Sequence, residues 1–472
     1  MVSKGAAKIT LGGKIIVRGW YFDNISSQGY GLNDDDVAVN TGGLPVKTGS
    51  LAAYSTNAYL TVDAKIGDNV QGFMELETSG GESNKSGVYF WGTYDTKPNT
   101  EMKFRQLWLQ YTGSGLLGAP AGIKAGHMPI VLGEMQFLRN DRFGDDAILA
   151  WVDPMKELHL LIGTTKLNEG DITESKDDLN GYVALMTYML DKDNTIGINY
   201  LLAHSDGNLP SFYALDFDTD IISPVIPGCD TLNFQNVGVH GNGKIAGVTY
   251  AAEVDFQFGK AEAVGFADDA DTNPDAKFKG WGVFAKLGYM LDPVNIRASF
   301  AMGSGDDDAY DNDIEEFQTL QGTDATSSIT IFPHYTMLYE RAVRTAAVSA
   351  IVSTYPGGNI RSTGIANTTY YNLGFDVSPI KEVTVSLDGF LLFATETGAW
   401  KDIVENETGE RVSVDDSLGW EIDAKMNWKL AKNLTYFVEA GMFKPGDFYK
   451  DIFESGADET ATTAVHGLLL TF

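Results

Sequence analysis

Apolar and polar side chains alternate along this chain from one end to the other. Between Val248 and Phe258, six apolar side chains take every second position, and threonine, alanine, acidic and amide side chains lie between them. A period of two places alternate side chains on opposite faces of a β-strand. The same division recurs in residues 9–21, 58–66, 294–302, 371–377, 383–393, 418–428 and 434–442. The chain is therefore predicted to be all-β.

The alternation alone does not separate a soluble β-sandwich from a membrane barrel, because both have one apolar face on each strand. The connections between strands do differ between these folds. Here tight connections alternate with much longer loops, and the tight ones are residues 67–69, 191–194, 291–293, 378–381 and 431–433. Short turns on one side of the membrane and long loops on the other are typical of outer-membrane barrels.

Two further features favour the membrane barrel. Trp420 and Trp428 lie on one apolar face, and the tilted strand between them covers about 20 Å along the membrane normal. That spacing fits two aromatic girdles around an apolar band about 25 Å tall. The opposite face carries charges in almost every strand, which is more than a dry core could bury without partners.

These features predict a single transmembrane antiparallel β-barrel over residues 1–472, with short periplasmic turns and long extracellular loops. Strands of about ten residues give a count of about 18, with 16 and 20 as alternatives, and both termini lie on the short-turn side. Residues 304–366 are predicted to be a long extracellular loop region. A barrel of this size leaves an aqueous channel, so the charged face is expected to line a lumen.

Composition excludes several other classes of protein. We find no apolar run that approaches the roughly 18 residues required by a membrane-spanning helix. The single cysteine, Cys229, excludes an intramolecular disulfide and a CxxC site. A net charge of −30 argues against binding to nucleic acid. No export signal begins the sequence, so we expect a mature outer-membrane protein from which the signal has been removed.

The last residues, Val465 to Phe472, alternate and end on an aromatic side chain. They resemble the terminal strand of bacterial outer-membrane porins, although His466 departs from the pattern because it lies on the face expected to meet lipid. Phe104 to Tyr111 and Ile123 to Pro129 resemble the strand pair before the constriction loop of trimeric general porins. The resemblance implies a general-diffusion porin that assembles as a homotrimer among outer-membrane lipid and lipopolysaccharide.

The resemblance also implies that the next segment, residues 130–146, folds into the lumen and faces basic residues on the wall. The expected constriction residues of this segment are Glu134, Arg139, Asp141, Arg142 and Asp145. The alternation places these basic residues on the inner wall: Lys14, Arg18, Lys65, Lys286, Arg297 and Lys425. The pattern breaks at Arg105 and Gln106, which predicts a bulge and leaves the direction of Arg105 open. For each charge, the alternative is an ordinary solvated group of the lumen.

Acidic side chains slightly outnumber basic ones on the predicted inner wall. They are Asp63, Glu75, Glu77, Glu253, Asp255, Asp376, Asp388, Glu421, Asp423 and Glu439. An acidic lumen raises the local concentration of cations, so a weak cation preference is expected. The aromatic residues predicted to point inward are Trp20, Phe22, Tyr59, Phe73, Trp108 and Phe284.

Motifs for other chemistry are incomplete. One acidic cluster offers oxygen ligands for Ca²⁺ but lacks a complete calcium-loop pattern, so a solvated outer loop is the simpler interpretation. Its residues are Asp306, Asp307, Asp308, Asp311 and Asp313. Residues 113–118 match G-x-G-x-x-G, yet Pro120 follows where a dinucleotide site needs a helix. Neither G-x-S-x-G nor H-E-x-x-H occurs, so we expect no enzymatic activity and no cofactor apart from this Ca²⁺ alternative.

The sequence thus predicts a passive, water-filled channel for ions and small hydrophilic solutes. The alternative is a channel selective for one solute, such as a sugar, an oligosaccharide or an organic acid, and inward aromatic residues favour it. An enzyme or adhesin built on a barrel would require a catalytic set or a plugged pore.

Overall fold

The computed structural model describes residues 7–24, 50–79, 89–91, 101–115, 118–169, 176, 178–207, 229–262, 275–308, 311–321, 336–340, 364–409, 411–452 and 459–472. The long strands are β1 (Ala7–Asp23), β2 (Ser50–Ile66), β3 (Val70–Ser79), β5 (Glu101–Ser114), β6 (Pro120–Val131), β7 (Leu138–Met155), β8 (Leu158–Asn168), β9 (Leu179–Met189), β10 (Thr195–Ser205), β11 (Thr231–Ile245), β12 (Val248–Glu262), β14 (Trp281–Leu291), β15 (Val294–Gly303), β18 (Thr368–Ile380), β19 (Val383–Ala394), β20 (Ser417–Ala431), β21 (Leu434–Pro445) and β22 (Ala461–Thr471).

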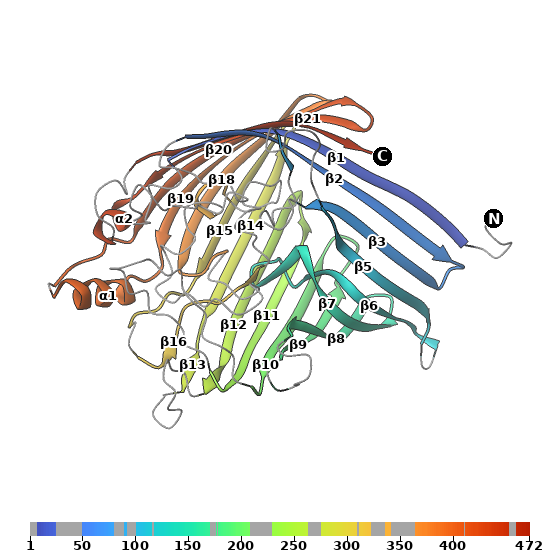
Figure 1. Cartoon of the computed structure of the whole chain (residues 1–472), viewed down its shortest axis with the longest axis horizontal. Helices are drawn as coiled ribbons and strands as arrows, with labels where there is room; N and C mark the ends of the chain where they lie inside the picture. The colour runs from blue at the N-terminus through green and yellow to red at the C-terminus, as the bar shows by residue number, and fades with distance from the viewer. Residues whose placement is uncertain are drawn as a thin grey trace.

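These strands form a closed antiparallel barrel of 18 strands within the described ranges (Figure 1). Each long strand pairs with the next along the chain, and β1 pairs with both β2 and β22, which closes the ring. The predicted fold class is confirmed. Four short strands add to this sheet: β4 (Tyr89–Phe90), β13 (Ala276–Phe278), β16 (Asp313–Ile314) and β17 (Leu320–Gln321). Two helices, α1 (Gly398–Thr408) and α2 (Asp447–Ile452), follow β19 and β21.

One end of the barrel has tight turns and the other has longer connections. Two-residue turns join β7 to β8, β11 to β12, β14 to β15, β18 to β19 and β20 to β21. In the turn from β11 to β12, Ala246 and Gly247 have φ angles of 51° and 89°, as a two-residue hairpin turn requires. The helices lie at the end of the barrel away from both chain termini (Figure 1). We call the two ends the turn end and the loop end.

The outer face of the barrel is an apolar belt. Leu11, Leu109 and Ile162 are 66–69% exposed, although they would be core residues in a soluble protein. Lipid satisfies such a belt, because the strands bond all backbone groups to one another and leave only apolar side chains outward. Trp420 and Trp428 lie on this face, as predicted. Among the described residues, no helix is long and apolar enough to span a bilayer.

The inner face differs between the two ends of the barrel. On β20, Glu421 and Asp423 are buried, whereas Asn427, nearer the turn end, is exposed. On β12, Glu253 is buried and Thr249 is exposed. Inward side chains in the loop half are therefore covered, and those in the turn half contact water.

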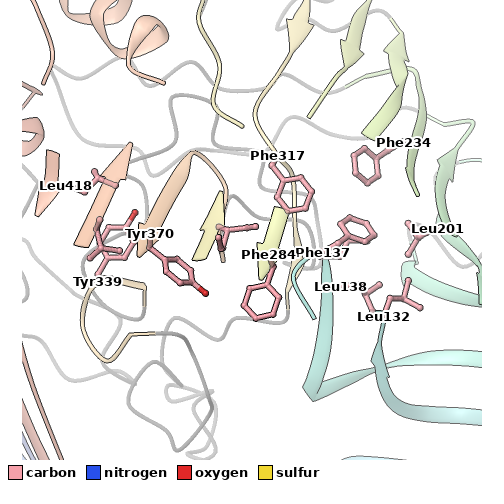
Figure 2. Close-up of a cluster of buried hydrophobic side chains, with 14 of the residues drawn as sticks. Leu132, Phe137, Leu138, Leu201, Phe234, Phe284, Phe317, Tyr339, Tyr370 and Leu418 are labelled. Carbon is pink, nitrogen blue, oxygen red and sulfur yellow. The ribbon is translucent and has the colours of Figure 1, made fainter. Parts of the chain in front are cut away.

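Part of this cover comes from the connection between β6 and β7. Only residues 132–137, which we call the hairpin tip, lie outside strands, because β7 begins at Leu138. The ring of Phe137 lies 6.0 Å from that of Phe234 on β11, a strand that is not a neighbour of β6 or β7 in the ring. Figure 2 shows Phe137 among Leu138, Leu201 and Phe234. The hairpin tip therefore reaches across the inner side of the barrel.

The described parts of residues 304–366 also lie against the inner wall. Gln257 of β12 accepts a hydrogen bond from the Gln318 N–H and donates one to the Gln318 carbonyl, at 2.8 and 2.6 Å. Leu320 pairs in parallel with Leu138 at the start of β7. The expected extracellular loop region thus folds partly back into the barrel, because its apolar and amide side chains find partners there. The segments 309–310, 322–335 and 341–363 lie outside the described residues.

Candidate functional site: the inner wall of the barrel

Arg297 is the most heavily bonded of the predicted wall bases. It donates to both carboxylate oxygens of Asp376 on β18, at 2.8 and 2.9 Å. It also donates to both oxygens of Asp388 on β19, at 2.9 Å each. The planar guanidinium has enough fixed donors for two bidentate pairs, which a lysine does not. Arg297, Asp376 and Asp388 together carry a net charge of −1, and their bonds link β15, β18 and β19.

Arg105 points inward from a bulge. The register with β3 shifts so that Glu75 faces Gln106 and Leu76 faces Phe104, which leaves Arg105 as the extra residue. The Arg105 guanidinium donates to Glu75 at 2.7 Å and to the backbone carbonyl of Asp141 at 2.8 Å. The bulge predicted from the break in alternation is therefore present, and it aims Arg105 at the inward hairpin.

Among the predicted constriction residues, Glu134 lies in the hairpin tip, and Arg139, Asp141 and Asp145 lie in β7. The Glu134 carboxylate accepts a hydrogen bond from Asn242 on β11 at 2.6 Å. Arg139 pairs with Asp141 at 3.3 Å. Asp145 is buried within β7. The side chain of Arg142 lies outside the described residues.

A wall acid holds the tip in place. Glu253 of β12 accepts hydrogen bonds from the backbone N–H groups of Glu134 and Gln136, at 2.7 and 3.3 Å. The sequence predicts Glu253 to be inward, but its role as an acceptor for backbone amides follows only from the fold.

A second wall acid has the same role for residues 336–340. Glu421 of β20 accepts hydrogen bonds from three consecutive backbone N–H groups, those of Met337, Leu338 and Tyr339, at 2.7 to 2.8 Å. Asp423 accepts a further bond from Met337 at 3.1 Å. Figure 2 shows Tyr339 beside Tyr370 and Leu418 of the wall. Residues 336–340 are thus fastened to β20 inside the barrel.

Aromatic and lysine side chains lie in two groups on the wall from β1 to β6, one on β3, β5 and β6 and one on β1 and β2. The rings of Phe73 and Trp108 stack at 5.3 Å. Lys124 lies 3.9 Å from the centre of a Trp108 ring, and Lys14 lies 4.1 Å from that of Tyr59. We call the three residues Phe73, Trp108 and Lys124 the aromatic–lysine strip. Lys124 is a wall residue that the sequence prediction missed, although it lies in the alternating segment before Ala125.

The remaining predicted bases are dispersed. Arg18 is buried on β1, donates to Asn57 at 3.3 Å and lies 5.3 Å from the Trp20 ring. Lys65 lies 3.8 Å from Asp63 near the turn end. Lys286 is exposed on β14, and Lys425 is half-buried on β20. The wall bases therefore do not converge on one point opposite the hairpin tip.

The acidic cluster 306–313 is bonded internally. The carboxylate of Asp306 accepts the backbone N–H groups of Asp308 and Glu315, at 3.2 and 3.1 Å. Lys279 pairs with Asp313 at 2.5 Å. Burial, together with the nearby charges of Asp311 and Glu315, raises the pKa of Asp306 to about 7. Across the described part of the chain, no group of three or more His, Cys, Asp or Glu residues is arranged to hold a metal ion, so calcium at this loop stays a prediction.

Solved structures share this architecture. No family model matches the chain, and no curated protein matches it. The chain is similar to Pseudomonas aeruginosa OccK2 (OpdF), with a TM-score of 0.53, 10% identity and 98% of each chain covered. It is also similar to P. aeruginosa OccK5 (OpdH), with a TM-score of 0.51, 11% identity and 98% of each chain covered. The complex of OccK2 with glucuronate gives a TM-score of 0.51 at 11% identity, again over 98% of each chain.

These similar structures are outer-membrane channels. At such low identity, the likeness concerns the fold, and it agrees with the closed barrel and its apolar belt. The chain has the fold of a multi-pass bacterial outer-membrane channel, which confirms the porin-like barrel predicted from the sequence.

Proposed function

We propose that this protein is an outer-membrane channel selective for small ring-shaped solutes such as sugars and sugar acids. The aromatic–lysine strip is the observation that carries this proposal. Phe73, Trp108 and Lys124 are only partly buried, so the strip contacts the water of the turn half. Aromatic faces bind the apolar faces of rings, and ammonium groups bind hydroxyl or carboxylate oxygens.

Two further observations support selectivity over general diffusion. The hairpin tip and residues 336–340 occupy the loop half of the barrel, and this reduces the space available to a solute. The OccK2 structure, which is similar in fold, has been solved in complex with glucuronate. The function requires binding and release of an unchanged solute, so no catalytic group is needed.

Single-channel recording in planar bilayers tests this proposal. We expect the purified protein to conduct small ions and to be blocked saturably by glucuronate or a neutral sugar. Trp108→Ala and Lys124→Gln should weaken the block by about tenfold, equivalent to about 1.4 kcal/mol. Lys286→Gln, which removes an exposed lysine elsewhere on the wall, serves as the control.

Large steps that no solute blocks would instead support a general-diffusion porin. Assembly as a homotrimer stays a prediction of the sequence resemblance, and closure in three equal steps at high voltage would support it.

A weak cation preference is a separate part of the proposal. Many inward carboxylates lie on the described wall, and the group around Arg297 keeps a net negative charge. Such charges raise the local concentration of cations. The reversal potential across a tenfold salt gradient should therefore favour cations weakly, and an anion-selective reversal potential would contradict this expectation.

A further inference from the structure

The inner faces of β10, β11 and β12 bring two polar side chains together over a glycine, with a third next to them on β12. In the sheet register, Asn199 and Asp255 flank Gly238 on either side. A Cβ atom at Gly238 would lie 2.4 Å from Asp255 Oδ1 and 2.6 Å from Asn199 Oδ1. Both side chains therefore lie over Gly238, and they occupy the space that a side chain at this position would fill. Glu253 lies two residues before Asp255, on the same face of β12.

The three side chains are deeply buried and incompletely bonded. Asn199, Glu253 and Asp255 are each 1% exposed. One oxygen of each, Asn199 Oδ1, Glu253 Oε1 and Asp255 Oδ2, is buried without a hydrogen-bond partner. Buried oxygens of this kind destabilise the folded protein when they are left unsatisfied. All three of these oxygens have lone pairs that can accept a hydrogen bond or ligate a cation.

The other atoms of these side chains are already engaged. Glu253 Oε2 accepts the two backbone N–H groups of the hairpin tip. Asp255 Oδ1 accepts a hydrogen bond from Asn236 at 2.8 Å. Asn199 Nδ2 lies 3.4 Å from Nδ1 of His240, the residue that faces Glu253 across the sheet. The orphaned oxygens thus remain available to a further ligand.

The charge of this cluster also calls for a partner. Glu253 and Asp255 lie within hydrogen-bonding reach of each other. Neither has a lysine or arginine among the ion pairs of the described residues. The other titratable groups facing them are His240 and, on the hairpin tip, Glu134. Two buried carboxylates without a counter-charge are strongly unfavourable, so a cation or a shared proton must compensate them.

We propose that Asn199, Glu253 and Asp255 bind one divalent cation of the calcium class inside the barrel. Hard cations take carboxylate and amide oxygens as ligands, and all three orphaned atoms are of these types. A charge of +2 balances the two carboxylates, which a monovalent ion does not. Water molecules supply the remaining ligands that Ca²⁺ requires.

The site has a mechanical consequence for the hairpin. A cation on Oε1 keeps Glu253 ionised and leaves Oε2 to the amides of Glu134 and Gln136. Cation binding therefore strengthens the attachment of the hairpin tip to β12. The acidic cluster 306–313 is a different set of residues, and Asp313 within it already pairs with Lys279.

Calorimetric titration of the detergent-solubilised, EDTA-treated full chain with CaCl₂ tests the proposal. We expect one saturable site per chain that weakens at least tenfold in Asp255→Asn and in Asn199→Ala. Asp313→Asn, which removes an acid of the outer cluster, should retain the site. An absence of saturable binding in the unmodified protein, or unchanged binding in Asp255→Asn, would overturn the proposal and leave the shared proton as the explanation.

Hydrogen exchange gives a second readout that does not depend on the variants. In the unmodified protein, CaCl₂ should slow amide exchange in residues 132–137 by several-fold relative to EDTA, with no change in residues 336–340. Equal exchange in both solutions would contradict the coupling between the cation and the hairpin tip.

Discussion

At the scale of single residues, the wall uses carboxylates as fixed acceptors. A carboxylate offers two oxygens with several lone pairs, so one side chain accepts two or three N–H groups at once. Glu253 and Glu421 do this for backbone amides, and Asp376 and Asp388 do it for Arg297. Charge-assisted bonds of this kind are stronger than neutral ones, most of all where water is scarce.

Replacing Arg297 by Met is expected to destabilise the barrel. It leaves Asp376 and Asp388 facing each other without a counter-charge, and because these side chains are partly exposed we expect a loss of about 1–3 kcal/mol. Urea unfolding in detergent measures it. Arg297→Lys keeps the positive charge but lacks the planar guanidinium, so its stability to urea should lie between those of the parent and the Met variant. A Met variant as stable as the parent would contradict this account.

The raised pKa of Asp306 predicts a pH-dependent loop. An ordinary carboxyl group has a pKa near 4, and the pKa of Asp306 in the folded loop is about 7. Between pH 4 and pH 7, Asp306 is therefore protonated in the folded loop and ionised when the loop is released. The arrangement is therefore most stable below about pH 4 and weakens as the pH rises through 7. Amide exchange at Asp308 and Glu315, corrected for its intrinsic rate, should be up to about a hundredfold faster at pH 8 than at pH 5.

The Asp306→Asn variant cannot ionise and provides the control. Its corrected exchange should change little between the two pH values, and an equal pH dependence in both proteins would show that another group is responsible.

Some residue-level features could be predicted from the sequence and others could not. The break in alternation at Arg105 revealed the bulge, because a bulge changes the local period. The partners of Arg297 on β18 could not be predicted, because residues 304–367 separate the two strands and only the closed ring makes them neighbours.

At the scale of elements, segments from the loop end fold inward and are fastened to the wall by acids. The hairpin tip is held by β12, and residues 336–340 are held by β20. The short strand β17 links residues 304–321 to the start of β7. These contacts make the loop half of the barrel drier than the turn half.

Glu421→Gln is expected to release residues 336–340. The glutamine amide nitrogen cannot accept an N–H, so at least one of the three bonds is replaced by a repulsive contact, at a cost of about 1–3 kcal/mol. Amide exchange of Met337 to Tyr339 should become faster and channel conductance should rise. Glu439→Gln, a change to a half-buried acid on β21, is the control, and identical exchange in both variants would contradict the anchoring role.

Strand positions were largely predictable, whereas loop positions were not. The period of two locates strands because lipid and water impose opposite demands on the two faces. No comparable demand acts on residues 304–366, and the inward position of their described parts depends on distant partners such as Gln257 and Glu421.

At the scale of the whole molecule, the barrel separates a lipid face from a lumen face residue by residue. Leu287 is 54% exposed on the belt, and its neighbour Lys286 lies on the lumen face. Leu287→Lys should cost about 2–4 kcal/mol near the bilayer midplane. Lys286→Met should change stability little, and reversible unfolding in lipid vesicles compares the two. Equal costs would mean that the belt is not in contact with lipid.

The pairing of β1 with β22 gives the ring a seam. Gly13 and Phe472 exchange two backbone hydrogen bonds there, at 2.9 and 3.0 Å, between residues from opposite ends of the chain. Contacts so distant in sequence carry the largest loss of chain entropy on closure. Until the seam closes, both edge strands have unpaired amides that hydrocarbon cannot satisfy. A partly assembled sheet is therefore not stable within the bilayer. Insertion is cooperative, because only the pairing of β1 with β22 satisfies the last unpaired backbone amides of the ring.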